Sequence, residues 1–590
     1  MTYNIVTVDE LNKELNDYIA AHGEPAELLE NLKVVASSLC DLSRRCNHIV
    51  ILTDYDADGI CSAYIMEKLL KALNPRKDFH VEVRCNDSRG SYGVSKDIVA
   101  EEDTKYIVLD MGSNDLDFIR NTLGEDTIIV DHHVIETSSV RSAFRHDRHL
   151  LNPKCRKCED GSYTEYCATG LVYRLFQILL ERKELIIDFP TRNSVTAAAC
   201  IGTIADCVPV MDKHSLNYDI IMEGFNVVNN ADEDSLPFPW GYFLRTAGFN
   251  EFDCTAEQFK FGVCPMLNVG YRLSPVLNEN LSQMIYDTLS GADNITTYDR
   301  INYIQTLNTQ RKAAVKVLTD DPQYKKFVYD ERERNLDSNV CVYLIPDGQT
   351  PRSFCGPLAN KLADALEKAV ICLTYNEEQQ CWQGSARNAP GQSSLLKFIY
   401  DILARPEGKD LNVKFGGHDN ALGISSIPDK DAMQFVSLVH QYHDLLKGKP
   451  PLETVLAIDP LQLNSPEMLE KIRRLEPTGL LEKYPCLFKG KELYRNGKFD
   501  SRGGKDVKVK VDNDKNKIIE SHDFCYTDNA YPWTKTKEEV AVLCTIGVCT
   551  YKEEKLQFNS IADRDFLKDR REEVQNEIAK ATKKSKGKDA

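Results

Sequence analysis

Short apolar segments that alternate with helical patterns most constrain how this chain can fold. The segment HIVILT (48–53) is rich in β-branched residues, and ICSAYIMEKLLKAL (60–73) has apolar residues at helical spacing. Further candidates for buried strands are VEVRC (81–85), YIVLD (106–110) and TIIVD (127–131). Buried strands separated by helices indicate βαβ units and a parallel sheet. The sequence therefore predicts an α/β domain in this region.

The same alternation returns later in the chain, and a β-rich region follows it. A second α/β segment runs from the strand candidate VCVYLI (340–345) to ALGISS (421–426). From residue 485 on, runs such as DVKVKV and EEVAVLCTIGVCTY indicate a small β-barrel of the OB-like type. We predict seven segments: an N-terminal helical segment (1–45), the first α/β domain (46–224), a helical connector (225–335), the second α/β domain (336–428), a helical link (429–484), the barrel (485–562) and a charged tail (563–590).

Net charge and hydrophobicity argue against two classes of protein. The 590 residues include 73 Lys and Arg against 90 Asp and Glu, a formal charge of −17. Such a charge argues against a protein that coats nucleic acid or an anionic membrane along its whole surface, but it is compatible with a local basic groove. No run of about 18 uncharged apolar residues exists, so we expect no membrane span. The acidic start lacks the apolar core of a signal peptide, and we expect a cytoplasmic protein with its 19 cysteines reduced.

One local basic stretch stands out against this acidic background. Residues 489–517 contain ten Lys and Arg against five acidic residues, and Tyr494 and Phe499 lie among them. A basic groove with aromatic side chains on a small barrel suits single-stranded nucleic acid, because every base has a face that can stack. A solvated barrel face is the alternative interpretation.

Three carboxylates follow the first predicted strand in the segment DYDADG (54–59). An EF-hand calcium loop would need Glu at position 65, where the chain has Ile65, and a helix rather than a strand before the segment. A solvated acidic turn is possible for this segment in isolation. Other acidic and histidine residues in similar positions argue for a site.

The other members of this constellation also follow apolar runs. Asp110 ends one predicted strand, Asp131-His132-His133 ends another, and Asp206 follows an Ala/Ile run in GTIADCVPV. In open α/β sheets the carboxyl ends of the strands form the ligand crevice. Six or seven oxygen and nitrogen ligands suit two divalent ions, Mn²⁺ or Mg²⁺, better than a closed tetrahedral zinc site. Such a pair of ions activates a water molecule and stabilises the leaving oxygen of a phosphoester.

These segments resemble the DHH phosphoesterase superfamily. DYDADG, VLDMG, DHH and GTIAD stand in its order and spacing, and GSARN (384–388) and FGGHDNALG (415–423) resemble its DHH-associated second domain. The resemblance implies a parallel-sheet catalytic domain and a second α/β domain that binds phosphate. It implies that Asp110 bridges two ions, that His133 faces the phosphate and that Asp131 orients a histidine. The metal ligands that it implies are Asp54, Asp56, Asp58, Asp110, His132 and Asp206.

Within the superfamily, the chain looks most like the RecJ family of single-strand-specific 5′→3′ exonucleases. The similar segments are SYGVS (91–95), FGVCPMLNVGYRLSP (261–275), NTQRK (308–312) and IRRLEPTGLLEKYPCLF (472–488). Three positions depart from the family pattern: Ser91 in place of Gly, Met266 in place of Arg and Asn388 in place of Ser. These departures affect candidate phosphate contacts and leave the metal-binding segments complete.

The RecJ resemblance implies a substrate and a mechanism. Single-stranded DNA would thread between the two α/β domains, its 5′-terminal phosphate would dock on the second domain, and a nucleoside 5′-monophosphate would leave, in DNA repair and recombination. A single-strand-binding protein or a helicase is the expected kind of partner, and we expect a monomer. The substrate-binding residues that we predict are Arg272, Arg311, Ser385, Arg387, Gly416, Gly417 and His418.

Two other functions stay open at this point. The first is a phosphodiesterase for small oligonucleotides, such as nanoRNA or dinucleotides, and the chain length beyond GGH argues against it. The second is a non-catalytic replication scaffold, and the complete Asp/His set argues against that.

A group of cysteines raises a separate question. Cys155, Cys158 and Cys167 lie close in sequence, with His146 and His149 upstream. A C-x2-C pair with a third Cys and a His could hold zinc, but no second C-x2-C exists, so ordinary loop cysteines are the favoured interpretation.

Overall fold

The chain forms two compact units, residues 21–449 and residues 1–20 together with 450–590. The computed structural model describes residues 4–87, 93–135, 147–231, 235–249, 254–291, 293–335, 337–345, 350–389, 391–448, 454–457 and 465–484, and the backbone of six strands between 486 and 560. The seven-segment division predicted above is finer than these two units and stays a prediction. No helix in the described ranges is both long and apolar enough to span a membrane.

The first sheet of the larger unit is parallel throughout, as predicted. Its strand order is β3-β2-β4-β5-β6. The bounds are β2 (His48–Thr53), β3 (His80–Cys85), β4 (Thr104–Leu109), β5 (Ile128–Val130) and β6 (Leu150–Leu151). The first four lie at the predicted strand segments.

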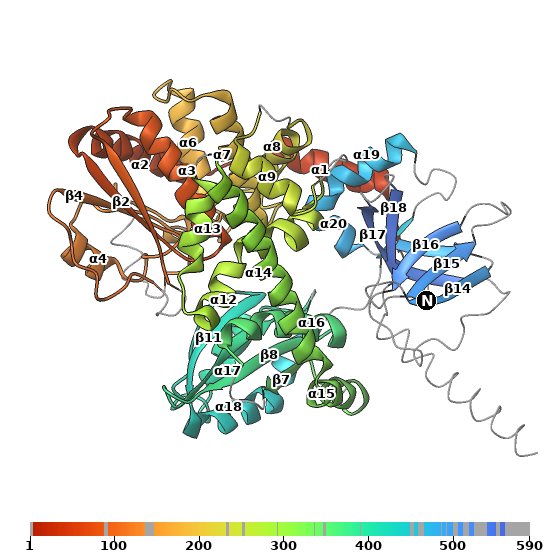
Figure 1. The fold of residues 1–590 in the computed structure, drawn as a ribbon. Coiled ribbons are helices and arrows are strands. Elements are labelled where there is room, and N and C mark those ends of the chain that lie inside the picture. Colours follow the sequence, from red (N-terminus) through yellow and green to blue (C-terminus); the bar gives the residue numbers. More distant parts are fainter. Residues whose placement is uncertain are drawn as a thin grey trace, which may run out of the picture. The chain divides into compact units, whose positions relative to one another are not determined.

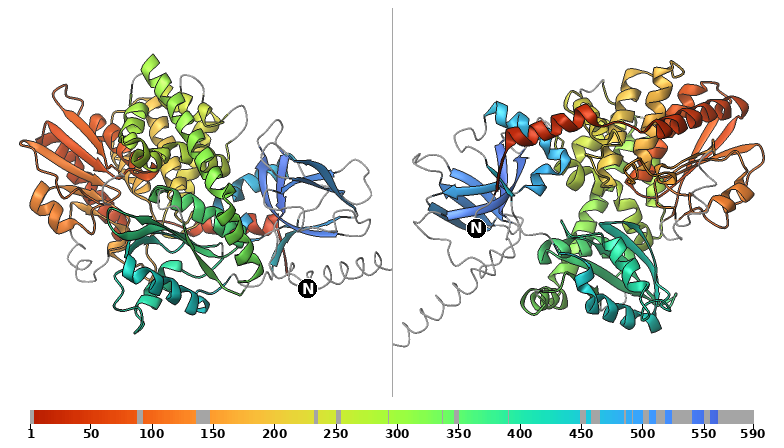
Figure 2. Two further views of the ribbon diagram at one scale, coloured as in Figure 1. Left: turned by 60° about the horizontal axis from the view of Figure 1, so that its bottom comes forward. Right: turned by 180° about the vertical axis from the view of Figure 1, so that it is seen from behind.

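Helices cover both faces of this sheet, which is why its strands are apolar on both sides. Ile49 and Ile51 of β2 pack into the core beneath α2 (Ala26–Arg45), α3 (Ala57–Leu73), α6 (Ala168–Glu181) and α7 (Phe189–Ala205). Val50 and Leu52 pack on the opposite face with α4 (Leu116–Leu123). Figure 2 shows α2 lying across the sheet from behind.

A group of helices connects the first sheet to the second. It comprises α8 (Asn217–Asn229), α9 (Phe238–Thr246), α10 (Ala256–Gln258), the π-helical turn Phe259–Val263, α11 (Cys264–Leu267), α12 (Val269–Leu277), α13 (Leu281–Leu289), α14 (Ile295–Asp320) and α15 (Pro322–Glu333). The long helix α14 packs on α9 and α12 at one end and reaches the second α/β region at the other (Figure 1).

The second sheet is mixed, with strand order β10-β11-β9-β8-β7. The strands are β7 (Val340–Leu344), β8 (Ala369–Asn376), β9 (Cys381–Arg387), β10 (Lys414–His418) and β11 (Ala421–Pro428). Only β7 and β8 are parallel. Helix α16 (Cys355–Leu366) covers one face, and α17 (Leu395–Leu403) and α18 (Asp429–Gln441) cover the other.

The smaller unit contains an eight-stranded sheet that combines both ends of the chain. Strand β1 (Asn4–Thr7) precedes α1 (Val8–Ala21) and pairs in parallel with β12 (Thr454–Ala457). Helix α19 (Pro466–Leu475) packs near α1, and the Asn12 side chain of α1 donates to the Lys471 carbonyl of α19 at 3.2 Å. The remaining strands are β13 (Cys486–Gly490), β14 (Glu492–Phe499), β15 (Lys505–Lys510), β16 (Ile518–Asp523), β17 (Val540–Cys549) and β18 (Lys555–Ser560).

These strands occupy the region predicted to be β-rich, and the OB-like barrel itself stays a prediction. The side chains of the basic stretch 489–517, Tyr494 and Phe499 among them, lie outside the described residues, as does the tail 563–590.

Candidate metal centre and phosphate site

The turn between β2 and α3 places three carboxylates at the carboxyl edge of the first sheet. Asp56 is the N-cap of α3, and its Oδ1 accepts the backbone N–H groups of Asp58 and Gly59 at 3.0 and 3.2 Å. A Cβ atom at Gly59 would lie 2.4 Å from the Asp54 carbonyl oxygen, so only glycine permits this tight turn. The local sequence therefore fixes where Asp54, Asp56 and Asp58 stand.

Asp58 is held by the N-terminus of α6. Its Oδ2 accepts the Ala168 N–H at 2.9 Å and its Oδ1 accepts the Thr169 N–H at 2.8 Å, while the Thr169 hydroxyl donates to the Asp58 carbonyl at 2.8 Å. A helix N-terminus favours a negative charge, which makes this a suitable place for a buried carboxylate. Each carboxylate oxygen keeps a second lone pair that can bind a cation.

The parallel register of β2, β4 and β5 brings Asp110 and Asp131 to the same level of the sheet as Asp54. Thr53 pairs with Leu109, and Leu109 pairs with Val130, so Asp54, Asp110 and Asp131 each follow by one residue the last paired position of a strand. Asp110 has a left-handed backbone with φ of 60°, a conformation that Asp and Asn tolerate better than most residues.

The Asp131 side chain orients the two histidines that follow it. Its Oδ2 accepts the Ser113 N–H at 2.9 Å, and its Oδ1 accepts the N–H groups of His132 and His133 at 2.7 and 3.1 Å. The same Oδ1 lies 2.8 Å from Nδ1 of His133. Burial lowers the pKa of His133, but the Asp131 carboxylate raises it to about 9.

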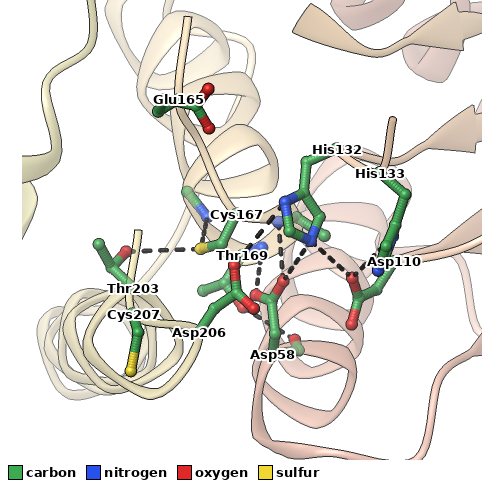
Figure 3. A network of polar contacts seen from close by, with 12 residues as sticks. Asp58, Asp110, His132, His133, Glu165, Cys167, Thr169, Thr203, Asp206 and Cys207 are labelled. Carbon is green, nitrogen blue, oxygen red and sulfur yellow. Dashed lines mark hydrogen bonds and ion pairs between the residues drawn. The ribbon is translucent and has the colours of Figure 1, made fainter. Parts of the chain in front are cut away.

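Three of the predicted metal ligands, Asp58, Asp110 and Asp206, point toward a fourth, His132 (Figure 3). Its Nε2 lies 3.2 Å from Asp110 Oδ1 and 3.7 Å from Asp58 Oδ2, and its Nδ1 lies 3.7 Å from Asp206 Oδ2. Three groups have ligand atoms within 4.8 Å of one another: Asp54 with Asp56 and Asp110, Asp110 with His132 and His133, and Asp58 with His132 and Asp206. The structure thus brings together all six predicted ligands and places His133 beside them.

The chemistry of this cluster fits divalent cations. Oδ1 of Asp54 and Oδ2 of Asp206 are buried, and neither has a hydrogen-bond donor within the described part of the chain. Burial, followed by neighbouring carboxylates, raises the pKa of Asp54, Asp110 and Asp206 well above the ordinary value. Oxygen and imidazole donors in this number match Mn²⁺ or Mg²⁺, which would offset the charge that burial opposes.

A second group of residues joins the metal cluster to the second sheet. The Ala57 N–H donates to Asn268 Oδ1 at 2.9 Å, and the rings of Tyr55 and Tyr271 lie 5.4 Å apart. The Arg272 guanidinium lies 4.2 Å from the centre of the Tyr271 ring. Arg272 also donates to the Ser353 carbonyl at 2.6 Å, and the Ser353 hydroxyl donates back to the Arg272 carbonyl at 2.7 Å.

Four arginines gather at this junction. A Cβ at Gly356 would lie 3.0 Å from an Arg272 nitrogen and 3.1 Å from an Arg387 nitrogen. Burial and the charge of Arg272 lower the pKa of both Arg387 and Arg311. The Arg352 guanidinium acts on Tyr55, where it opposes the rise in pKa that burial causes. Within the described ranges no carboxylate forms an ion pair with any of the four, and we call this cluster of positive charge the arginine cradle.

Strand register shows how the second sheet contributes to this cradle. Gly423 of β11 pairs with both Ser385 of β9 and Gly416 of β10, so these three share one row across the sheet. In the next row on the same face, Ala421 pairs with Arg387 and with His418. The side chain of His418 lies outside the described residues.

Gly417 does not join this face. It pairs with Leu422, whose side chain is buried in the core, and its φ of 135° suits only glycine. The assignment of Gly417 to the substrate-binding residues thus stays a prediction. Of the three departures from the family pattern, Met266 is buried in the core, Asn388 donates to the Ser393 carbonyl at 2.8 Å, and Ser91 lies outside the described residues.

Two residues of the site, Asn268 and Arg352, were not singled out from the sequence, and Cys167 was considered there only as a zinc ligand. Asn268 lies within the RecJ-like segment 261–275, so position-by-position comparison of that segment could have found it. Cys167 is the N-cap of α6, where its Sγ accepts the Gly170 N–H at 3.2 Å. Arg352 begins the short 3₁₀ helix Arg352–Phe354, and no sequence signal marks it.

Comparisons with known proteins agree with the resemblance to the DHH superfamily and to RecJ. Residues 48–203 match the model of the DHH family, N-terminal domain. The single-stranded-DNA-specific exonuclease RecJ of Bacillus subtilis is 24% identical over 471 residues, which cover 78% of this chain and 54% of that protein. The RecJ of Thermus thermophilus is 22% identical over 458 residues, 76% of this chain and 60% of that protein. The chain therefore spans only part of the length of these relatives.

Solved structures show the same likeness in the fold. The crystal structure of RecJ in complex with Mn²⁺ from Thermus thermophilus has a TM-score of 0.62 at 18% identity, and the match covers 90% of this chain and 71% of that one. The complex with Mg²⁺ gives a TM-score of 0.59 at the same identity. The expectation of Mn²⁺ or Mg²⁺ agrees with these two complexes. The resemblance inferred from the sequence is confirmed: residues 48–203 match the model of the DHH family, N-terminal domain, and the chain shares its fold with RecJ.

Proposed function

We propose that this chain is a metal-dependent exonuclease that degrades single-stranded DNA from the 5′ end and releases nucleoside 5′-monophosphates. The observation that carries the proposal is the pairing of a buried Asp/His cluster with a nearby cradle of four arginines that have no carboxylate partner in the described ranges. The names of the RecJ relatives support the choice of single-stranded DNA. The role in DNA repair and recombination that the resemblance implies is part of the same proposal.

The metal ligands in this proposal are the six residues predicted from the sequence. Asp54, Asp56 and Asp110 would hold one divalent ion, and Asp58, His132 and Asp206 the second, with Asp110 close enough to His132 to serve both. When bound, the ions supply Lewis-acid chemistry: they activate water and offset the negative charge of the phosphodiester.

His133 and Asp131 have separate tasks. Asp131 raises the pKa of His133, which favours the protonated imidazole that can donate a hydrogen bond to a phosphate oxygen. Asp131 accepts from Nδ1 of His133, so Nε2 is the ring nitrogen that would face the substrate.

The arginine cradle explains attack at an end of the strand. Ser385 and Arg387 on one face of β9 would hold the terminal phosphate, with Arg272, Arg311 and Arg352 around it. A terminal phosphate carries more charge than an internal one, so four cations favour the end of the chain. The half-buried pair Tyr55 and Tyr271 lies between the cradle and the metal cluster, where a base or sugar can stack.

Digestion of end-labelled single- and double-stranded DNA and of RNA with Mn²⁺ tests the proposal. We expect mononucleotides from the 5′ end of single-stranded DNA and faster cleavage of a 5′-phosphorylated strand than of a 5′-hydroxyl strand. Arg387→Ala should raise KM for the phosphorylated strand at least tenfold, whereas Arg334→Ala, at the exposed C-cap of α15, should leave KM unchanged.

Three results would contradict the proposal. Cleavage confined to di- to pentanucleotides would favour a small-oligonucleotide phosphodiesterase. Release of label from the 3′ end would reverse the polarity. Absence of any cleavage by the Mn²⁺-loaded protein would favour a non-catalytic scaffold.

A further inference from the structure

A second cluster of potential metal ligands lies apart from the Asp/His centre, on two loops of the first α/β region. Cys158 and Asp160 come from the loop between β6 and α6, and His214 comes from the loop between α7 and α8. One ligand atom from each of the three lies within 4.8 Å of the other two. None of them belongs to the group of residues around His132.

This cluster differs from the zinc set considered from the sequence. Cys155 packs against the apolar face of the first sheet, and Cys167 caps α6, with its Sγ 3.7 Å from the Thr203 hydroxyl. The C-x2-C pair and the third cysteine therefore do not form one site. The chain folds so that Cys158 instead meets an aspartate two residues later and a histidine 56 residues later.

Local hydrogen bonds form the Cys158 loop into a fixed turn. The Gly161 N–H donates to the Cys158 carbonyl at 2.9 Å, and Gly161 has a φ of 83°. The Ser162 N–H donates to Asp160 Oδ1 at 3.0 Å, which leaves Oδ2 directed at His214. That Oδ2 lies 3.3 Å from His214 Nε2, close to the separation of two ligands on one tetrahedral ion, about 3.3 to 3.8 Å.

We propose that Cys158, Asp160 and His214 bind a zinc ion, with solvent in the fourth position. A thiolate, an imidazole and a carboxylate form a donor set that Zn²⁺ accepts readily and that Mg²⁺ or Mn²⁺, which prefer oxygen, do not. The side chains of Asp160 and His214 are 36% and 21% exposed, so an ion can enter from solvent.

Lys213 is the competitor that such an ion must displace. Its Nζ lies 2.5 Å from Asp160 Oδ2, and this contact, followed by the hydrogen bonds from Ser162, lowers the pKa of the Asp160 carboxyl. Asp160 is therefore ionised at neutral pH, and a doubly charged ion replaces a singly charged one on the same oxygen. Both side chains are more than one-third exposed, so the Lys213 pair is a weak obstacle.

The two loops joined by this zinc ion also frame the Asp/His centre. The Glu165 N–H donates to Asp212 Oδ2 at 3.0 Å, and the Leu216 N–H donates to the Tyr166 hydroxyl at 2.8 Å, so the loops are already hydrogen-bonded to each other. One loop ends at the amides that hold Asp58, and the other begins at Asp206. The zinc ion is thus a structural link that fixes the distance between these two ligand segments.

Metal analysis of the purified full-length chain tests the proposal. After treatment with a chelator, incubation with Zn²⁺ and desalting, we expect Cys158→Ser and His214→Ala each to retain about one zinc ion per chain fewer than wild type. Cys155→Ser is the matched control in the same C-x2-C pair and should retain as much zinc as wild type. Thermal unfolding of each variant shows whether it is folded.

A Co²⁺ spectrum separates this site from the Asp/His centre, which has no sulfur ligand. Co²⁺-loaded protein should show a sulfur-to-cobalt charge-transfer band that is lost in Cys158→Ser and unchanged in Cys155→Ser and Asp110→Asn. Absence of this band in the folded wild-type protein would overturn the proposal, as would equal zinc retention by wild type and Cys158→Ser. Loss of zinc from folded Cys155→Ser would also overturn this ligand assignment.

Discussion

Replacement of Asp110 by asparagine should make the protein more stable without metal and unresponsive to metal. Asp110 is buried among the carboxylates of Asp54, Asp56, Asp58 and Asp206, and this environment raises its pKa well above the ordinary value. A raised carboxyl pKa means that the ionised form destabilises the folded state at neutral pH. Asparagine removes that charge and tolerates the left-handed backbone at this position, so the substitution isolates electrostatics from strain.

The size of the metal response follows from mass action. An ion at 100 times its Kd stabilises the folded state by about 2.7 kcal/mol. The larger unit, roughly 430 residues, has an unfolding entropy of about 0.9 kcal/mol/K, so each ion should raise its Tm by about 3 °C and two ions by about 6 °C. Because Asp110 belongs to two of the three ligand groups, Asp110→Asn should lose most of this shift.

Thermal unfolding with and without Mn²⁺ measures both effects. Asp103→Asn is the matched control, because Asp103 has a φ of 57°, is exposed and lies outside the ligand groups. The control should keep the full Mn²⁺ shift. If Asp110→Asn kept it too, or if its metal-free Tm fell below that of wild type, the placement of Asp110 in a repulsive, metal-binding cluster would be refuted.

Two further predictions follow from the same centre. In the metal-free protein, the stability advantage of Asp110→Asn over wild type should shrink as the pH falls from neutral toward 3.8, because the wild-type carboxyl with its raised pKa then takes up a proton. Denaturant unfolding across this pH range measures the difference in stability between the two proteins. A difference that grows as the pH falls would contradict the prediction. Gly202→Ala should lower the free energy of unfolding by about 1–3 kcal/mol, because the added Cβ would lie 2.3 Å from the hydroxyl of Thr169. Since Thr169 holds Asp58, the same variant should bind Mn²⁺ more weakly in a titration followed by Tm. Gly241→Ala is the control for Gly202→Ala, because Gly241 lies in a helix and the atom nearest to an added Cβ would be 3.7 Å away. This control should be as stable as wild type or up to about 1 kcal/mol more stable. Equal effects of the two substitutions would show that Thr169 is not displaced.

The sequence predicts best where a local pattern decides the structure. The buried strands were predictable because β-branched apolar runs have few alternatives, and the acidic residues that end them had to meet at one edge once the sheet was parallel. Asp54, Asp110 and His132 illustrate this: each lies one or two residues beyond a strand, and the structure brings them together.

Contacts between distant segments were not predictable in the same way. Nothing in the local sequence shows that residues 4–7 form a strand that pairs with 454–457, because that pairing depends on tertiary contacts rather than on propensity. Arg352 reaches the site only because the second sheet stands beside Tyr55, and Cys158 meets His214 only because two loops are hydrogen-bonded together. Such placements depend on the whole packed core.

The common register of β2, β4 and β5 has a consequence for how this chain can change in length. Because Asp54, Asp110 and Asp131 follow paired residues at one level of the sheet, inserting or deleting one residue inside any of these strands would turn its buried face over and move its acidic residue away from the others. Segments that connect the strands at the opposite, amino edge of the sheet do not affect where these three acidic residues stand. Insertions scanned through the chain should therefore divide sharply, with function lost inside the three strands and retained in connections such as the one between α3 and β3.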